Sequence, residues 1–180
     1  MRQAVFLDRD GVINRAMVLN GKPYPPANIK EVEILPGVLE ALVALHDAGF
    51  ILIVVTNQPD VARGTTPRAV VEEINHYLAN CLPIDEFRTC YHDSNDGCDC
   101  RKPMPGALLA AAQLHGIDLS SSYMVGDRWR DTEAGVRAGC QTIFIDYGYN
   151  ELPPESFTFS VKSLNEASII ILGQQPYEKH

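Results

Sequence analysis

The sequence lacks the features of a membrane, secreted or nucleic-acid-binding protein. No apolar run approaches the about 20 residues that span a bilayer, and the first residues lead into a short apolar segment rather than a signal-peptide core. Basic residues are the minority, 15 against 23 acidic ones, and the resulting net charge of -8 argues against nucleic acid as a partner. We therefore expect a cytoplasmic monomer with neither a membrane nor a nucleic-acid partner.

Two nucleotide-binding motifs are also missing. The chain has neither Gly-x-x-x-x-Gly-Lys nor Gly-x-Gly-x-x-Gly, so P-loop and dinucleotide binding are not indicated. Its 180 residues, 46% of them hydrophobic and 21% charged, suffice for one globular domain with a buried core. We expect this domain over residues 1–172 and a C-terminal tail over 173–180.

Apolar runs typical of strands alternate with segments of helical periodicity. This alternation predicts an α/β fold, a Rossmann-like three-layer sandwich around a mainly parallel sheet. Strands are expected over residues 4–7, 50–55, 87–91, 123–125, 142–145 and 157–161. Helices are expected over 36–48, 67–82 with Thr66 as its cap, 105–115 and 132–138, and after the capping-box pattern at 163–166. Residues 14–33 are expected to form a long functional loop, and no insertion is long enough for a separate cap domain.

Two carboxylates one residue apart, Asp8 and Asp10, follow the first expected strand. Because side chains alternate along a strand, both can point toward one spot. Carboxylates held that close repel each other, which favours a shared proton or a bound cation. A bare Asp-x-Asp can equally be a solvated turn, so the choice depends on the rest of the chain.

Polar side chains follow the other predicted strands and the cysteine-rich segment as well. They are Thr56 with Asn57, Asp127 with Asp131, and Arg101 with Lys102. The carboxyl ends of parallel strands meet at one sheet edge, where ligands bind. Acids together with bases and a hydroxyl indicate a cation and a phosphate, because Mg²⁺ commonly bridges carboxylates and phosphate oxygens. Taken singly, Thr56 and Asn57 could form a turn or cap, and the two bases could be solvated. Asp131 could be a first-turn helix acid or a partner of the site.

Four motifs in this order resemble those of the haloacid dehalogenase (HAD) superfamily of phosphatases across residues 4–147. They are Asp8-Arg9-Asp10-Gly11-Val12, Thr56-Asn57-Gln58, Arg101-Lys102-Pro103 and Gly126-Asp127. The resemblance implies that Asp8 attacks phosphorus to form an aspartyl-phosphate, while Asp10 acts as general acid and base. It also implies Mg²⁺ on the side chains of Asp8 and Asp127 and the backbone carbonyl of Asp10. Thr56 and Lys102 would stabilise the transferring phosphoryl group.

Four soft or borderline metal ligands crowd into residues 90–100: Cys90, His92, Cys98 and Cys100. Three thiolates and an imidazole complete a tetrahedral Zn²⁺ site and leave no open position, which is typical of a structural site. The residues between them are polar, so zinc would supply the order that packing cannot. The alternative is a flexible loop with three free thiols.

This loop, with the Arg101-Lys102-Pro103 that follows it, resembles the D-glycero-D-manno-heptose 1,7-bisphosphate 7-phosphatases and the related histidinol-phosphate phosphatases. The resemblance implies substrate contacts from Arg101, from Arg128, where these phosphatases often have lysine, and from two short runs. The runs are Ala16, Met17, Val18 and Leu19, and Asn57, Gln58 and Pro59. We therefore expect Mg²⁺-dependent release of the heptose 7-phosphate, in nucleotide-activated heptose biosynthesis. Histidinol-phosphate hydrolysis and non-catalytic sugar-phosphate binding are the alternatives.

Overall fold

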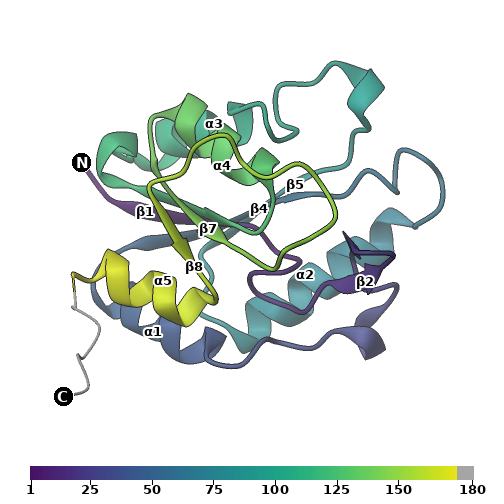
Figure 1. The fold of residues 1–180 in the computed structure, drawn as a ribbon, viewed down its shortest axis with the longest axis horizontal. Helices are drawn as coiled ribbons and strands as arrows, with labels where there is room; N and C mark the ends of the chain where they lie inside the picture. Colours follow the sequence, from purple (N-terminus) through teal and green to yellow (C-terminus); the bar gives the residue numbers. More distant parts are fainter. Residues whose placement is uncertain (174–180) are drawn as a thin grey trace.

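Six parallel strands form the central sheet of the chain, seen in a computed structural model that describes residues 1–173 (Figure 1). The strands are β1 (Ala4–Leu7), β4 (Ile51–Asn57), β5 (Glu86–Cys90), β6 (Tyr123–Gly126), β7 (Gln141–Ile145) and β8 (Phe159–Val161). Most of the tail predicted over 173–180 lies outside the described residues. Within 1–173, no helix has the length and hydrophobicity to cross a membrane.

Helices cover both faces of the sheet (Figure 1). One face carries α1 (Val38–Asp47), α2 (Arg68–Cys81) and α5 (Leu164–Ile171), and the other carries α3 (Gly106–His115) and α4 (Trp129–Ala138). In β1, Val5 and Leu7 pack against the side with α1, α2 and α5, whereas Ala4 and Phe6 pack against the side with α3 and α4. A strand covered on both faces is continuously apolar. The predicted three-layer α/β fold is confirmed.

The strand order β5-β4-β1-β6-β7-β8 is that of a doubly wound sheet. The chain builds outward from β1 on one side and then returns to place β6 on the other side of β1. Ligands of such sheets bind outside the carboxyl ends of the strands at this switch point. Asp8 follows β1 and Asp127 follows β6, so the topology alone brings these two carboxylates together.

The segment expected to be a long loop, residues 14–33, contains an antiparallel hairpin. Strands β2 (Met17–Leu19) and β3 (Lys22–Tyr24) pair there, and a 3₁₀ helix, η1 (Ile29–Glu31), follows. The turn is Asn20-Gly21, and both residues have positive φ, 51° and 74°, as a two-residue hairpin turn with an Asn-Gly sequence requires. The prediction of a long loop without strands was therefore wrong, because the Asn20-Gly21 turn closes a hairpin within it.

Two helix starts also differ from expectation. Helix α2 begins at Arg68 with Pro67 as its N-cap residue, so Thr66 is not the cap. Helix α4 begins at Trp129, three residues before the predicted start, because the Asp131 carboxylate accepts a hydrogen bond from the Arg128 amide at 3.0 Å and thereby caps it. Two further 3₁₀ turns, η2 (Ser94–Asp96) and η3 (Leu119–Ser121), lie in connecting segments.

Gly135 on α4 lets this helix lie directly on the sheet. A Cβ atom at this position would come within 2.6 Å of Thr142 Cγ2 and 2.7 Å of Met124 Cβ. Gly135→Ala should therefore lower the free energy of unfolding, because overpacking costs about 1–3 kcal/mol against a gain in helix propensity of about 1 kcal/mol. Urea unfolding measures the difference. Val136→Ala, an exposed position on the same helix, is the control and should change little. An alanine variant as stable as the wild type would contradict this packing.

Candidate active site

Lys102 is buried between two carboxylates at the ends of the central strands. Its Nζ lies 2.8 Å from Asp8 Oδ1 and 2.7 Å from Asp131 Oδ1, and it donates a hydrogen bond to the Val55 carbonyl at 2.7 Å. Only 2% of the Lys102 side chain is exposed. All three ammonium protons therefore have partners, which is the condition under which a buried lysine stays charged.

The charges in this cluster shift each other's pKa values. Burial raises the pKa of Asp8 to about 6, helped by the charge of Asp131 and opposed by Lys102. Burial alone would lower the pKa of Lys102, but the two carboxylates outweigh it and raise that pKa above its ordinary value. Above pH 6 Asp8 is therefore mainly an anion in contact with a permanently charged lysine, which is the state a carboxylate nucleophile needs.

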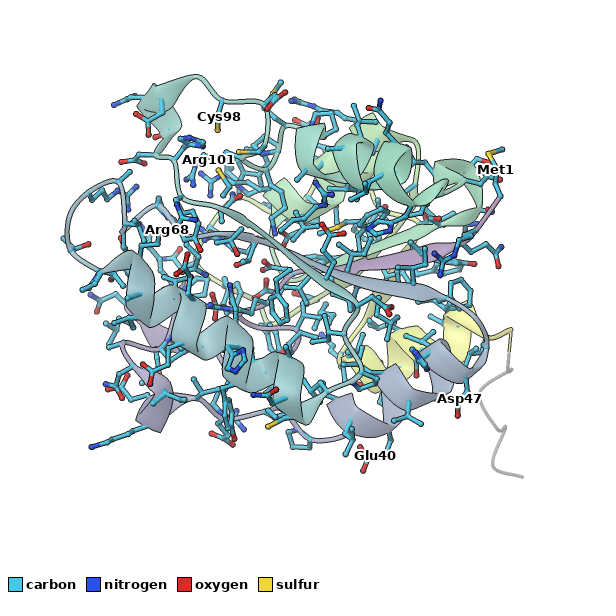
Figure 2. The ribbon with its side chains drawn as sticks, turned by 180° about the vertical axis from the view of Figure 1, so that it is seen from behind. Met1, Glu40, Asp47, Arg68, Cys98 and Arg101 are labelled. Carbon is cyan, nitrogen blue, oxygen red and sulfur yellow. The ribbon has the colours of Figure 1, made fainter. Side chains whose placement is uncertain are left out.

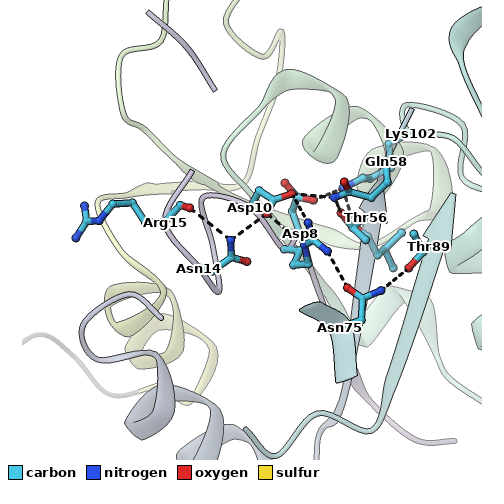
Figure 3. Close-up of polar contacts among 11 residues, drawn as sticks. Asp8, Asp10, Asn14, Arg15, Thr56, Gln58, Asn75, Thr89 and Lys102 are labelled. Atoms are coloured by element: carbon cyan, nitrogen blue, oxygen red, sulfur yellow. Dashed lines mark hydrogen bonds and ion pairs between the residues drawn. The ribbon is translucent and has the colours of Figure 1, made fainter. Parts of the chain in front are cut away.

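Asp10 accepts hydrogen bonds from three residues, two in its own loop and one after β4 (Figure 3). Gln58 Nε2 donates to Oδ2 at 2.8 Å and Asn14 Nδ2 donates to Oδ1 at 3.0 Å. The Arg9 guanidinium donates to both oxygens at 3.2 Å. Gln58 also donates to Thr56 Oγ1 at 3.0 Å. The predicted general acid and the predicted phosphoryl-binding hydroxyl therefore share one amide.

Sequence reasoning missed the support beneath Asp10. Arg9 is almost fully buried and donates through Nη1 to Asn75 Oδ1 on α2 at 2.9 Å. Asn75 in turn donates to Thr89 Oγ1 on β5 at 3.0 Å (Figure 3). The one sequence feature that could indicate a buried Arg9 is its position between Asp8 and Asp10, directly after an apolar strand.

Asp127 keeps one carboxylate oxygen unpaired in a buried position. Its Oδ2 accepts a hydrogen bond from the Tyr149 hydroxyl at 2.7 Å, whereas its Oδ1 has no hydrogen-bond partner within residues 1–173. Burial raises the pKa of Asp127 well above its ordinary value, and the charges of Asp8 and Asp131 add to the shift. Gly11, at a φ of 93°, allows this approach because a Cβ there would collide with the Asp127 carboxylate.

The carboxylates provide a donor set for a hard cation. One carboxylate oxygen each of Asp8, Asp127 and Asp131 lies within 4.8 Å of the other two, and the buried Asp127 Oδ1 has no hydrogen-bond partner among the described residues. Mg²⁺ takes oxygen ligands and is commonly bound by one or two carboxylates, so the residues fit the predicted ion. The Asp10 carboxylate is not in the group, and the prediction assigned only its backbone carbonyl to the metal.

Asp131 fulfils both of the roles considered for it. One oxygen caps α4 through the Arg128 amide, and the other pairs with Lys102. A Cβ on Gly126 would collide with the Asp131 side chain, so the glycine before Asp127 makes room for this second acid.

Asn57 joins β4 to the segment that carries Lys102. Its Nδ2 donates to the Lys102 carbonyl at 3.0 Å, and its Oδ1 accepts from the Lys102 amide at 3.1 Å. This pair of hydrogen bonds places the lysine opposite Asp8. Asn57 therefore has a structural role beside the substrate contact predicted for it.

A cavity of about 270 Å³ opens above these residues. Asp8, Asp10, Thr56 and Lys102 line it, together with four residues predicted to contact substrate, which are Asn57, Pro59, Arg101 and Arg128. Lys22 and Tyr24 of β3, Arg63 and Arg130 also line it. None of these four was predicted from the sequence, which placed the substrate contact of the hairpin on residues 16–19.

The remaining predicted substrate residues lie around the cavity. Gln58 is buried in the network beneath it, and Ala16, Met17 and Val18 line a neighbouring groove beside Tyr147 and Tyr149. Leu19 is exposed at the end of β2. Arg128 is paired with Glu151 at 2.6 Å while it lines the cavity. Contact of these residues with substrate stays a prediction.

The cysteine loop brings its four predicted ligands together. Cys90 Sγ lies 3.2 Å from Cys100 Sγ and 3.7 Å from Cys98 Sγ, and His92 Nδ1 lies 3.4–3.5 Å from two of the sulfurs. All four ligand atoms lie within 4.8 Å of one another. Sulfurs bound tetrahedrally at about 2.3 Å from zinc would be about 3.8 Å apart, so the arrangement fits that metal.

The same loop is joined to the rest of the cavity wall (Figure 2). Arg63 binds the Asp93 carboxylate with two hydrogen bonds of 2.7 and 2.8 Å, and Arg68 at the start of α2 packs 4.3 Å above the Tyr91 ring. Arg101, labelled beside Cys98 in Figure 2, donates to the His92 carbonyl at 3.4 Å. The loop thus orders two arginines that line the cavity.

Comparisons with known proteins agree with this geometry. The family model described as HAD-hydrolase-like matches residues 99–167. The chain is 36% identical to the D-glycero-beta-D-manno-heptose-1,7-bisphosphate 7-phosphatases of Pseudomonas aeruginosa and Escherichia coli K12. The matches cover 82% and 85% of this chain, respectively, and 83% of each relative.

Solved structures give the same result. A D,D-heptose 1,7-bisphosphate phosphatase from B. bronchiseptica, complexed with magnesium and phosphate, superposes with a TM-score of 0.82 at 29% identity, covering 96% of this chain and 99% of that one. A HAD-like phosphatase from Mesorhizobium loti gives a TM-score of 0.77 at 28% identity, covering 99% and 90%.

Proposed function

This chain belongs to the HAD-like phosphatases, the family of its heptose bisphosphate phosphatase relatives, and we propose that it hydrolyses the 7-phosphate of D-glycero-D-manno-heptose 1,7-bisphosphate through an aspartyl-phosphate on Asp8. It is an enzyme of the phosphoric monoester hydrolase class. The observation that carries the proposal is the ion pair of buried Asp8 with Lys102, in a cavity whose lining combines six basic residues with four carboxylates. The reaction would serve nucleotide-activated heptose biosynthesis in the cytoplasm.

In the first step the Asp8 carboxylate forms a bond to phosphorus while the bond from phosphorus to the sugar oxygen breaks. Lys102 already occupies Oδ1, so we expect Oδ2 to attack. The positive charge of Lys102 and the Thr56 hydroxyl would then stabilise the negative charge that the phosphoryl oxygens carry in the transition state. Mg²⁺ on the Asp8 and Asp127 carboxylates and the Asp10 carbonyl would reduce the repulsion between nucleophile and phosphate when bound.

Asp10 carries the proton in both halves of the reaction. It gives a proton to the departing sugar oxygen and later takes one from the water that attacks the phosphorus of the aspartyl-phosphate, which releases phosphate and regenerates Asp8. The amide donors of Gln58 and Asn14 and the Arg9 guanidinium fix the position of this carboxyl group. A fixed carboxyl group beside the nucleophile favours turnover over simple binding.

The charge of the cavity favours a sugar bisphosphate over histidinol phosphate. Lys22, Arg101 and Arg130 line the cavity and have no carboxylate partner among residues 1–173. A second phosphate would be attracted to these cations, whereas histidinol phosphate carries no second phosphate to pair with them. We also propose that Zn²⁺ in the Cys90–Cys100 loop orders the segment that presents Arg101 and Lys102, and that the enzyme is a monomer.

Asp8→Asn should abolish catalysis and leave the fold intact. The amide keeps the shape of the carboxylate but cannot attack phosphorus, so we expect phosphate release to fall at least about a thousandfold. Asp47→Asn, an exposed position on α1, should retain full activity as the matched control. Circular dichroism and thermal melting establish that both variants are folded. Turnover by a folded Asp8→Asn protein would contradict the nucleophile assignment.

Substrate preference tests the proposed function directly. Phosphate release should be measured under identical conditions on both anomers of heptose 1,7-bisphosphate and on histidinol phosphate. We expect kcat/KM to be highest for one of the bisphosphates, because only these carry a second anion for the cavity. A higher kcat/KM for histidinol phosphate would replace the proposed substrate with that alternative.

Metal analysis tests the cysteine loop. Protein freed of loosely bound ions should contain about one zinc per chain, and Cys98→Ser should lower the melting temperature before it affects turnover in the folded protein. Cys81→Ser is the control, because Cys81 is exposed and lies outside the cluster. Zinc-free protein with an unchanged melting temperature would exclude the structural metal.

A further inference from the structure

Residues 147–151, which follow β7, contact both loops that carry the central acids. Tyr147 donates through its hydroxyl to the Gly11 carbonyl at 2.9 Å, and Tyr149 donates to Asp127 Oδ2 at 2.7 Å. Glu151 accepts hydrogen bonds from the Arg128 guanidinium at 2.6–3.2 Å. Every second residue therefore reaches the site, the spacing at which side chains of an extended segment share one side.

The segment is fixed at both ends. Asp146 donates its amide to the Val161 carbonyl in β8 at 3.0 Å and accepts from the Gly148 amide at 2.9 Å. Asn150 donates its amide to the Gly21 carbonyl in the hairpin turn at 2.8 Å. The rings of Tyr147 and Tyr149 lie 5.5 Å apart at an interplanar angle of 32°. These contacts hold the Tyr149 hydroxyl in a defined place relative to β6.

The two oxygens of Asp127 have different surroundings because of this hydroxyl. Oδ2 is bound to Tyr149, and Oδ1 is buried without a partner in the described part of the chain. A carboxylate with one oxygen tied cannot rotate freely, so the second oxygen keeps a constant direction. The Asp127 carboxylate contributes one oxygen to a group with Asp8 and Asp131 whose ligand atoms lie within 4.8 Å of one another.

We propose that Tyr149 is a positioning residue for the divalent cation: its hydroxyl fixes the Asp127 carboxylate so that Oδ1 faces the ion, and it thereby sets the affinity for Mg²⁺. The inference rests on the Mg²⁺ site of the proposed function. Partners that orient a metal ligand from the outside change metal affinity by about 10–100-fold when they are removed. Nothing in the proposed chemistry requires Tyr149 to touch the substrate.

The test is Tyr149→Phe in the full chain, dialysed against magnesium-free buffer without chelator so that zinc is retained. Mg²⁺ binding is measured by titration calorimetry, and the Mg²⁺ dependence of phosphate release by steady-state kinetics. We expect the Kd and the KM for Mg²⁺ to rise about 10–100-fold, with kcat recovering at saturating Mg²⁺. Tyr123→Phe, at the opposite end of β6 where the ring packs on Phe50, is the matched control and should bind Mg²⁺ as the wild type does.

An unchanged Kd for Mg²⁺ in folded Tyr149→Phe protein would overturn the inference, whether or not kcat falls. Thermal melting checks folding, and Tyr149→His, which keeps a ring with an N–H donor, is the second variant and should give an intermediate Kd. A wild-type enzyme that binds Mg²⁺ but releases no phosphate would refute the proposed function instead. The calorimetric comparison of Tyr149→Phe with Tyr123→Phe would still decide the role of Tyr149.

Discussion

Charge balance at the carboxyl ends of β1 and β6 is the constraint on which this structure depends. Asp8, Asp127 and Asp131 are all buried there, and Lys102 is the buried lysine that offsets them. Removing one partner of a buried ion pair leaves an uncompensated charge that costs about 3–5 kcal/mol. The excess negative charge suits this end of the sheet to a cation, and the same lysine opposes the protonation of Asp8 that burial favours.

The rest of the fold maintains that balance. The doubly wound sheet places Asp8 and Asp127 on neighbouring strands, and glycines at positions 11 and 126 make room for the acids. Asn57 holds the backbone of Lys102. The cavity wall takes Lys22 and Tyr24 from the hairpin strand β3 and Arg101 from the segment that follows the cysteine loop.

The sequence predicted the parts of this site that follow from strand periodicity and motif order. Apolar runs that end in Asp8, Thr56 and Asp127 are visible without coordinates, because parallel strands align their carboxyl ends. The alternation of strand and helix patterns predicted the sheet and its two helical layers. The close spacing of Cys90, His92, Cys98 and Cys100 predicted the clustering of the four candidate zinc ligands. Helix starts were less predictable, since α4 begins on a cap that its own third residue, Asp131, provides.

Contacts between distant segments could not be predicted. Arg9 is buried and donates a hydrogen bond to Asn75, 66 positions away. Tyr149 lies 22 positions from Asp127, in a segment with no strand or helix signal. The spacing of Tyr147, Tyr149 and Glu151 by two residues is the one sequence feature that indicates that their side chains lie on the same side of an extended segment. The Asn20-Gly21 turn is different, because Asn-Gly between two strand segments is a local hairpin signal that the sequence itself contains.

The most direct test of the account is to identify the phosphorylated atom during turnover. Enzyme mixed with excess heptose 1,7-bisphosphate and Mg²⁺ is quenched within one turnover, digested and analysed by mass spectrometry. The account predicts a phosphoryl group on the peptide that contains Asp8, formed and lost at least as fast as phosphate appears in solution. Phosphate release without a phosphorylated peptide, or with the phosphoryl group on another residue, would contradict it.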